Sequence, residues 1–154
     1  MKEARFVARR PKLALDDFFP YLINRLGVIL VAGFLADALE PNHLSIAMWR
    51  VLVALSDQGT RRQVDLGDMT SIDASTLSRM VTRLAKMGLV TRARSETSDR
   101  EVEIKLTAKG GALLDKLVPL AIRHECGATA GISKTDLATA KGVLRRMHAN
   151  LTET

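Results

Sequence analysis

Residues 75–110 read STLSRMVTRLAKMGLVTRARSETSDREVEIKLTAKG, and this stretch decides the fold. Its order predicts a helix, a strand, a charged tip, a second strand and the start of another helix. Between Ala74 and Arg94 there are five Lys or Arg residues and no Asp or Glu. A cationic, hydroxyl-rich helix beside a basic hairpin has the chemistry that a surface binding duplex DNA needs. The stretch therefore predicts a DNA-binding unit.

The predicted helix has one apolar and one polar face. Leu77, Val81 and Leu84 follow at spacings of four and three, so they share one side. On the other side, Arg can bind guanine in a bidentate manner, and Ser or Thr can contact bases or phosphates. The candidate DNA-binding residues of this helix are Ser75, Thr76, Ser78, Arg79, Thr82 and Arg83. An ordinary amphipathic helix with a solvated polar face is the alternative.

The predicted hairpin has strands at about 89–93 and 101–106, joined by a tip at 94–100. Apolar and polar residues alternate along the second strand, which is typical of a half-buried strand. Arginines near the tip are suited to a narrow minor groove, where negative potential is concentrated. The candidate DNA-binding residues here are Arg92, Arg94, Asp99 and Arg100, with Asp99 expected to orient a neighbouring Arg. The alternative is a charged surface hairpin without such a role.

Helical spacing of apolar residues predicts three further helices before this unit, over about 18–39, 45–56 and 61–69. Asp16 and Asp17 are expected to cap the first of them. That first helix is apolar around more than one face, so it needs covering on more than one side. We expect part of this covering to come from another subunit.

A tight turn separates the helix at 61–69 from the helix at 74–87. Asp73 has the chemistry of an N-cap for the second of these helices, and Gly88 is placed to end it. A short helix, a tight turn and a longer helix form the helix-turn-helix arrangement. The longer helix is then the one that reads DNA.

The C-terminal third predicts two more helices. Thr107 is expected to cap a helix that runs to about Glu125, and Ser133 to cap the last one. The last helix carries an apolar stripe formed by Leu137, Ala140, Leu144, Met147 and Leu151. Because such stripes lie outside a compact lobe, they need a partner, and a two-fold copy of the same chain is the simplest one.

Composition limits the remaining function classes. The chain has 154 residues, a formal net charge of +6 and a pI near 9.9, which suit one domain with a polyanionic partner. A single cysteine, Cys126, favours a reducing cytoplasm. The uncharged run at 26–36 is shorter than a bilayer span, so no membrane partner is expected. The basic segment at 1–12 is either a solvated tail or an arm that reaches DNA.

Enzyme motifs such as a Gly-rich phosphate loop or a nucleophile elbow are missing from the sequence, so neither catalytic activity nor a cofactor is expected. Glu40, His43, His124 and Cys126 would form a metal sensor only if the first and fifth helices brought them together. The wide spacing of these four residues argues against a metal site.

These motifs together resemble the MarR family of winged helix-turn-helix transcriptional regulators. The resemblance is carried by PYLINRLGVIL, LSIAMWRVLVAL, STLSRMVTRLAKMGLVTR and SDREVEIKLTAKG, which cover most of residues 20–110. It implies a mainly α fold of six helices with a small β-hairpin wing (α+β). It also implies a homodimer in which a lobe at 43–109 binds double-stranded DNA, and helices at 13–40 and 110–154 interlock.

The same resemblance implies a palindromic operator, recognition contacts from residues 75–83, and Arg100 beside Asp99 in the minor groove. This chain departs from the family pattern at the wing. It has Glu101 where a second Arg is common, and Glu96-Thr97 where the family often has Asp-Pro. These departures bear on the wing geometry and on the strength of its minor-groove contact.

In the family that this chain resembles, many repressors release DNA when a small anionic aromatic or lipophilic effector binds between the dimer helices and the lobe. The resemblance therefore implies a candidate effector site formed by Tyr21, Asn24, Arg25, His43, Trp49 and Arg50. An arginine there can neutralise a carboxylate, and Trp49 can stack on a ring. Two alternatives stay open. One is a DNA-binding regulator without an effector, and the other is a winged-helix protein–protein interaction module.

Overall fold

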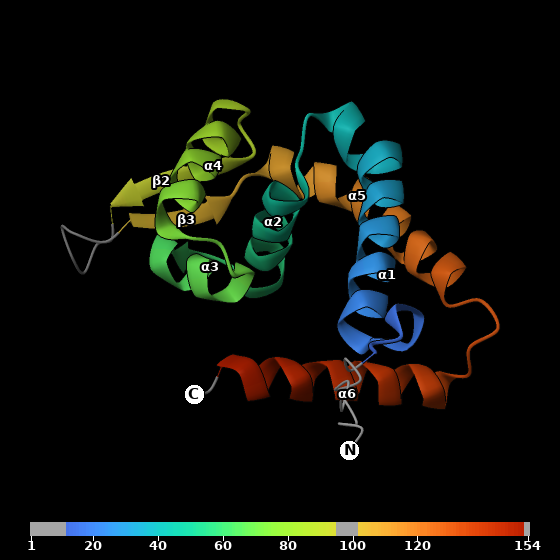
Figure 1. Ribbon diagram of the computed structural model, residues 1–154. Coiled ribbons are helices and arrows are strands. Elements are labelled where there is room, and N and C mark those ends of the chain that lie inside the picture. Colours follow the sequence, from blue (N-terminus) through green and yellow to red (C-terminus); the bar gives the residue numbers. More distant parts are fainter. Residues whose placement is uncertain (1–11, 95–101, 153–154) are drawn as a thin grey trace, which may run out of the picture.

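The computed structural model describes residues 12–94 and 102–152 (Figure 1). Its α-helices are α1 (Phe19–Phe34), α2 (Ile46–Gln58), α3 (Gln63–Thr70), α4 (Ala74–Lys86), α5 (Ala108–Ala128) and α6 (Lys134–Thr152). Its strands are β1 (Arg61–Arg62), β2 (Val90–Arg94) and β3 (Val102–Leu106). The predicted fold, six helices with a small β wing, is confirmed.

The wing is a sheet of three antiparallel strands in the order β1-β3-β2. Ile104 in the central strand pairs with Arg92 on one side and with Arg61 on the other. The prediction that a helix begins near residue 61 is therefore wrong. Arg61 and Arg62 instead pair with β3, and α3 begins at Gln63. A strand of two residues is too short to show the alternation of apolar and polar residues by which a strand is predicted from sequence.

The winged lobe closes its hydrophobic core within one chain. Helices α2, α3 and α4 and the sheet contribute fully buried side chains to it, and the predicted apolar face of α4 is among them. These side chains include Val51, Leu52, Leu55, Leu66, Leu77, Val81, Leu84 and Ile104. Because this face of α4 is buried, its opposite face is left on the outside of the lobe.

Two of the predicted helix caps are confirmed. The Asp73 carboxylate accepts a hydrogen bond from the Thr76 backbone N–H at 2.9 Å, and the Thr107 hydroxyl accepts one from the Gly110 backbone N–H at 3.0 Å. Each bond satisfies a donor that has no partner inside the helix. These caps fix where α4 and α5 begin.

The first helix differs from expectation at both ends. Asp16 and Asp17 lie in a 3₁₀ turn, and Phe18 occupies the N-cap without a side-chain hydrogen bond, so the predicted Asp caps are wrong. At the other end, α1 continues into a π-helical turn over Leu35–Leu39 and a 3₁₀ turn over Glu40–Asn42. These turns redirect the chain into α2.

The end of α4 is joined to the beginning of α5 by side-chain hydrogen bonds. Lys109 Nζ donates to the Met87 carbonyl oxygen at 2.8 Å, and the Thr107 hydroxyl donates to the Gly88 carbonyl oxygen at 2.7 Å. Gly88 has a φ of 73°, a left-handed conformation that favours glycine and ends the helix. The junction therefore fixes α4 to the first turn of α5.

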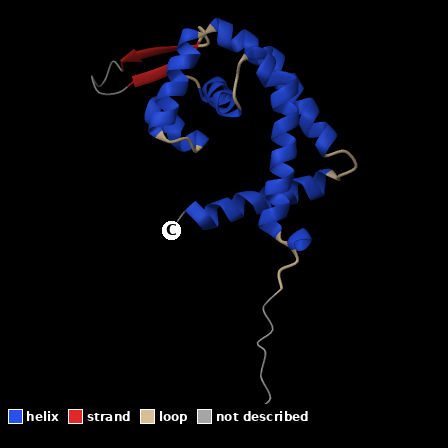
Figure 2. Cartoon of the chain, turned by 45° about the horizontal axis from the view of Figure 1, so that its top comes forward, coloured by secondary structure: helices blue, strands red, loops and turns tan. Residues whose placement is uncertain are grey.

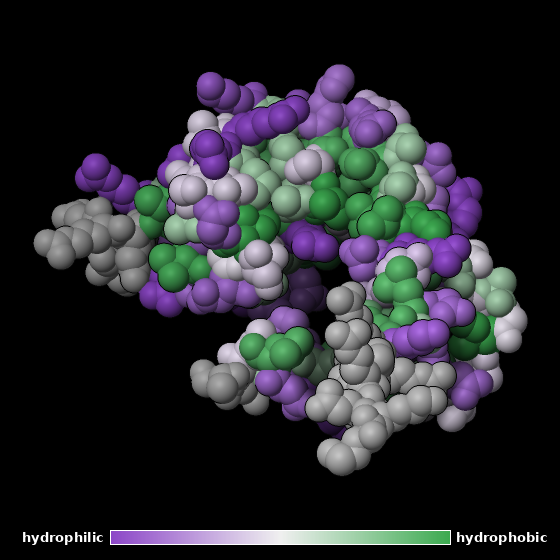
Figure 3. Space-filling model, viewed as in Figure 1, coloured by the Kyte–Doolittle hydropathy of each residue, from purple (hydrophilic) through white to green (hydrophobic). Residues whose placement is uncertain are grey.

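Helices α1 and α5 run side by side, and α6 crosses near the beginning of α1 (Figure 2). Much of the apolar surface of α1 is exposed: Leu26, Val28 and Ile29 are 58%, 61% and 64% exposed. Apolar side chains accordingly appear over α1 in the space-filling view (Figure 3). No described residue of α6 is buried. Unlike the lobe, this helical arm, formed by α1, α5 and α6, leaves much of its apolar surface exposed, although Phe34, Leu114 and Leu117 are buried.

The segment from Phe19 to Asn42 is also long enough to span a membrane, and 18 consecutive residues within it have a mean hydropathy of 1.8, with 17% of these residues buried. The uncharged run at 26–36 did not indicate a span of this length, because that run ends at the charged residues Arg25 and Asp37. Length and hydropathy are weak evidence, since apolar helices that pack against protein pass the same test. The segment packs along α5 in this structure.

Candidate nucleic-acid interface

The outer face of α4 carries the predicted recognition residues. Ser75, Arg79 and Thr82 are exposed, whereas Thr76 and Ser78 are half-buried. The face is positioned by the buried stripe on the other side of the helix and by the Asp73 cap at its beginning. The helix therefore presents hydroxyl and guanidinium groups to the solvent.

The first turn of α4 is held by Asp73. Its carboxylate accepts hydrogen bonds from the Thr76 backbone N–H at 2.9 Å and from the Ser75 hydroxyl at 2.8 Å. Hydrogen bonds from Thr76 and then Ser75 lower the pKa of Asp73 to about 2. Asp73 therefore stays ionised near neutral pH, and the Ser75 hydroxyl proton is engaged in the cap.

Arg79 and Arg83 lie one turn apart on α4 but have different partners. Arg79 Nη2 donates to the Thr76 hydroxyl at 3.4 Å, on the helix itself. Arg83 Nη2 donates to the His43 carbonyl oxygen at 3.3 Å, at the corner between α1 and α2. Arg79 therefore lies along the exposed helix face, and Arg83 reaches from the helix to that corner.

On the wing, Arg92 contacts both helices of the helix-turn-helix. Its guanidinium donates to the Thr82 hydroxyl at 3.0 Å and to the Gln63 side-chain oxygen at 3.4 Å. Sequence reasoning missed Gln63, because 29 residues separate it from Arg92. Arg94 is exposed at the end of β2. Asp99 and Arg100 lie outside the described residues.

The predicted effector residues do not share one cavity within a single chain. Trp49 and Arg50 line a cavity of about 530 Å³ with residues of α3, whereas His43 lines another of about 470 Å³ beside Lys109. The other three, Tyr21, Asn24 and Arg25, lie in the first half of α1. Trp49 contacts the far end of α1, where its ring packs edge-on against Phe34 at 5.2 Å. Arg25 and Phe34 are nine residues apart on α1, and at about 1.5 Å per residue this places them about 13 Å apart along the helix axis.

An apolar groove lies between α6 and the helices α1, α2 and α5, with a volume of about 460 Å³. Leu26, Phe34, Trp49 and Leu144 line it, and His124 and Lys141 add polar groups. Of the six predicted effector residues, Trp49 is the member that borders it. The groove combines an aromatic wall with the His124 imidazole and with an ion pair between Lys141 and Glu125.

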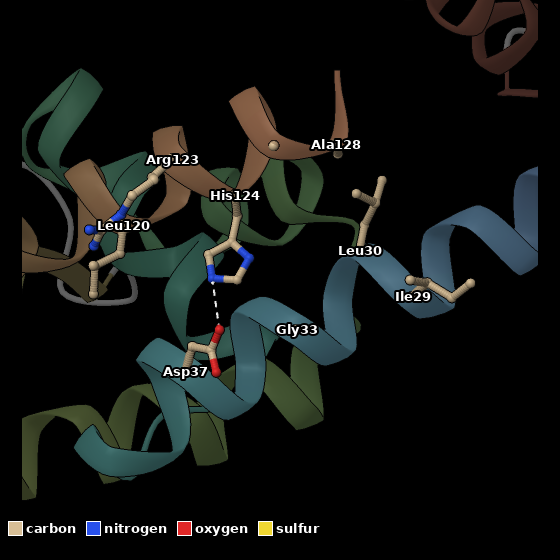
Figure 4. Close-up of a pocket in the computed structure, with 9 residues that line it drawn as sticks. Ile29, Leu30, Gly33, Asp37, Leu120, Arg123, His124 and Ala128 are labelled. Atoms are coloured by element: carbon tan, nitrogen blue, oxygen red, sulfur yellow. Dashed lines mark ion pairs between the residues drawn. The ribbon is translucent and has the colours of Figure 1, made fainter. Parts of the chain in front are cut away.

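Another cavity, of about 600 Å³, lies between α1 and α5 (Figure 4). His124 points from α5 towards Asp37, and His124 Nε2 lies 3.3 Å from the Asp37 carboxylate. In the part of the chain that the structure describes, no group of three or more His, Cys, Asp or Glu residues is arranged to hold a metal ion. The alternative of a metal sensor formed by Glu40, His43, His124 and Cys126 is therefore not supported.

Comparisons with known proteins agree with this geometry. A sequence profile of the MarR family matches residues 44–102, from the beginning of α2 to the wing. The HTH-type transcriptional repressor NicR of Pseudomonas putida is 35% identical over 119 residues, covering 72% of this chain and 75% of NicR. The organic hydroperoxide resistance transcriptional regulator of Bacillus subtilis is 31% identical over 109 residues, covering 69% of this chain and 71% of that protein. The chain belongs to the MarR family.

A solved structure extends the match across the fold. BpsR of Bordetella bronchiseptica, described as regulated in its DNA binding by 6-hydroxynicotinic acid, superposes with a TM-score of 0.75. The two sequences are 28% identical, and the alignment covers 84% of this chain and 97% of BpsR. MarR-family proteins are DNA-binding regulators of transcription and not enzymes. This MarR-family protein is therefore a transcriptional regulator, and the family profile covers most of its winged lobe.

Proposed function

We propose that this MarR-family protein is a homodimeric repressor that binds a palindromic operator. The observation that carries the proposal is the exposed polar face of α4, which has Arg79 and hydroxyl groups without an acidic residue from 74 to 94. In the proposed complex α4 lies in the major groove, and the wing reaches the adjacent minor groove through Arg94 and Arg100. The relative NicR is named a transcriptional repressor, which supports repression rather than activation.

We propose that the helical arm is the dimer interface. The lobe then consists of residues 43–109, and residues 13–40 and 110–154 pair with the same residues of a second copy. The exposed apolar side chains of α1 and the unburied α6 support this division, because contiguous apolar surface of this kind marks an interaction site. Membership of a family of DNA-binding regulators favours protein, rather than lipid, as the cover for this surface.

We propose a small aromatic acid as the effector and the cytoplasm as the compartment. The regulation of BpsR by 6-hydroxynicotinic acid supports the effector class. In this chain the groove bordered by Trp49 offers an aromatic wall and the His124 imidazole, and Lys141 would exchange its Glu125 partner for the carboxylate of the effector. An effector would act by stabilising a lobe spacing unsuited to successive major grooves, which are about 34 Å apart.

Selection of bound duplexes from a randomised pool tests the DNA-binding proposal. We expect a palindromic site, bound by a dimer, with an affinity that falls steeply as salt rises. If no sequence is enriched and binding to other proteins is insensitive to salt, the chain is an interaction module instead. A repressor would further reduce transcription from a promoter carrying the selected site.

The effector proposal has a separate test. Addition of 6-hydroxynicotinic acid or related aromatic acids should raise the Tm of the protein and release the selected duplex. A Trp49→Ala variant should lose this response while it still binds the duplex. A Tm and a DNA affinity that do not change with any aromatic acid would leave a regulator without such an effector.

A further inference from the structure

Arg92 lies where the wing meets both helices of the helix-turn-helix. Its Nη1 donates to the Thr82 hydroxyl of α4 at 3.0 Å, and its Nη2 donates to the Gln63 side-chain oxygen at the start of α3 at 3.4 Å. One planar guanidinium thus joins β2 to both α4 and α3. We call Arg92, Thr82 and Gln63 the wing clasp.

The Thr82 hydroxyl is engaged within the protein. A threonine hydroxyl has one proton and two lone pairs. Thr82 donates its proton to the Ser78 carbonyl oxygen at 2.9 Å, and one lone pair accepts from Arg92. The proton is therefore not available to a base, although Thr82 lies on the exposed face of the recognition helix.

We propose that Arg92 is a positioning residue of the DNA interface. Through Thr82 and Gln63 it fixes the angle between the wing and α4, and it contributes to DNA affinity through this geometry rather than by neutralising a phosphate. The inference rests on the proposed function, because it concerns how the same surface meets DNA. The sequence predicts that Arg92 and Thr82 contact DNA directly. In this proposal they instead hold α4 and the wing in the orientation in which other residues contact DNA.

The angle between the wing and α4 matters because, in the proposed complex, α4 lies in the major groove and the wing tip in the minor groove. Contacts by α4 and by the wing tip can form together only when the wing stands at one angle to the helix. The clasp bonds are solvent-exposed in the free protein. When DNA covers this face it excludes water, and hydrogen bonds strengthen in a less polar surrounding. The clasp is thus strongest in the complex.

The salt dependence of DNA affinity distinguishes a positioning role of Arg92 from neutralisation of a phosphate by its charge. We would measure affinity for the duplex selected by the wild-type protein, over a range of salt concentrations, for Arg92→Gln and Arg92→Lys. The clasp predicts about ten-fold weaker binding by both variants, since Lys cannot bond two acceptors as a planar fork. It also predicts an unchanged slope of log affinity against log salt for Arg92→Gln.

Thr82 offers the conservative pair of variants. Thr82→Ser keeps the hydroxyl and should bind DNA as the wild type does, whereas Thr82→Val removes it and should weaken binding. Because Arg92 and Thr82 act as one unit, Arg92→Gln and Thr82→Val should not add in the double variant. Arg94→Gln is the matched control on the same strand, and its effect should add to that of Thr82→Val. Thermal unfolding of each variant shows that the fold is kept.

Opposite results would overturn the wing clasp. If Arg92 neutralises a phosphate, Arg92→Gln should lower the magnitude of the slope by about 0.9 in each protomer, or about 1.8 for a dimer. Arg92→Lys should then restore binding, and the effects of Arg92→Gln and Thr82→Val should add. These results would reject the clasp while DNA binding by the wild type stands. If the wild type selects no duplex, the proposed function itself fails.

Discussion

The winged lobe and the helical arm differ in how they bury apolar side chains. In the lobe, Leu66 and Ile104 are 0% exposed, whereas in the arm Ile29 is 64% and Leu151 81% exposed. The lobe encloses a hydrophobic core within one chain. The arm has longer helices, of 16, 21 and 19 residues against 13, 8 and 13 in the lobe, and much of their apolar surface faces outwards. This difference supports the proposal that a partner covers the arm.

The largest expected effect comes from placing a charge on the arm. Ile29→Glu should convert the proposed dimer to a monomer, because it would bury an unpaired carboxylate in the interface, at a cost of several kcal/mol. Sedimentation or light scattering at a series of concentrations measures this. Val64→Glu is the matched control, since Val64 is 75% exposed but lies on α3 of the lobe. A dimer that survives Ile29→Glu would contradict the comparison.

A methyl group at Gly110 tests how closely the beginning of α5 packs against the lobe. A Cβ there would lie 2.3 Å from the Leu89 carbonyl oxygen, so backbone would have to move. We expect Gly110→Ala to lower the free energy of unfolding by about 1–3 kcal/mol or more.

Gly111→Ala is the control for that change, because its Cβ would meet nothing within 4 Å. It should raise the free energy of unfolding by up to about 1 kcal/mol, since alanine favours a helix over glycine. Urea unfolding at one protein concentration measures both variants. Equal effects of the two substitutions would show that the junction is not tightly packed.

Substitutions in the lobe should affect base preference more at a residue of the major groove than at a residue of the minor groove. We expect Arg79→Ala to lose about 1–3 kcal/mol of binding and to relax base preference at one position of the half-site. Arg100→Ala should weaken binding with less effect on the choice of bases in the major groove. Titration of the selected duplex and of its single-base variants measures both. Wild-type affinity in both variants would refute the assignment of these residues.

The smallest expected effect concerns pH and the cap of α4. The pKa of Asp73 is lowered to about 2 from 3.8, so its charge stabilises the fold above about pH 4. That stabilisation is lost as the pH falls from about 4 through about 2, because the unfolded chain takes up its proton at a higher pH than the folded form does. Asp73→Asn keeps a capping oxygen without the charge. Its Tm should be below that of the wild type near neutral pH and should equal it at about pH 2.

The sequence predicted features whose chemistry is local. Asp73 and Thr107 cap the helices that follow them, and Gly88 ends α4, because the partners of each are within a few residues. Ser133 likewise accepts from the Asp136 backbone N–H at 3.1 Å, as its spacing predicted. The buried stripe of α4 follows in the same way from helical periodicity.

Features that depend on distant pairing were not predictable. β1 exists because Arg61 and Arg62 lie beside β3, which follows some 40 residues later. The contact between Arg92 and Gln63 depends on the same sheet. The end of α5 at Ala128 lies three residues beyond the predicted end at about Glu125. The predicted effector residues stay a prediction, because the structure separates them within one chain.

In the proposed dimer, the bonded junction between α4 and α5 would couple the arm to the lobe. Lys109 and Thr107 attach the end of α4 to the first turn of α5. We expect the two helices to tilt as one lever, so that a change in the angle between the two arms of the proposed dimer would displace both copies of α4.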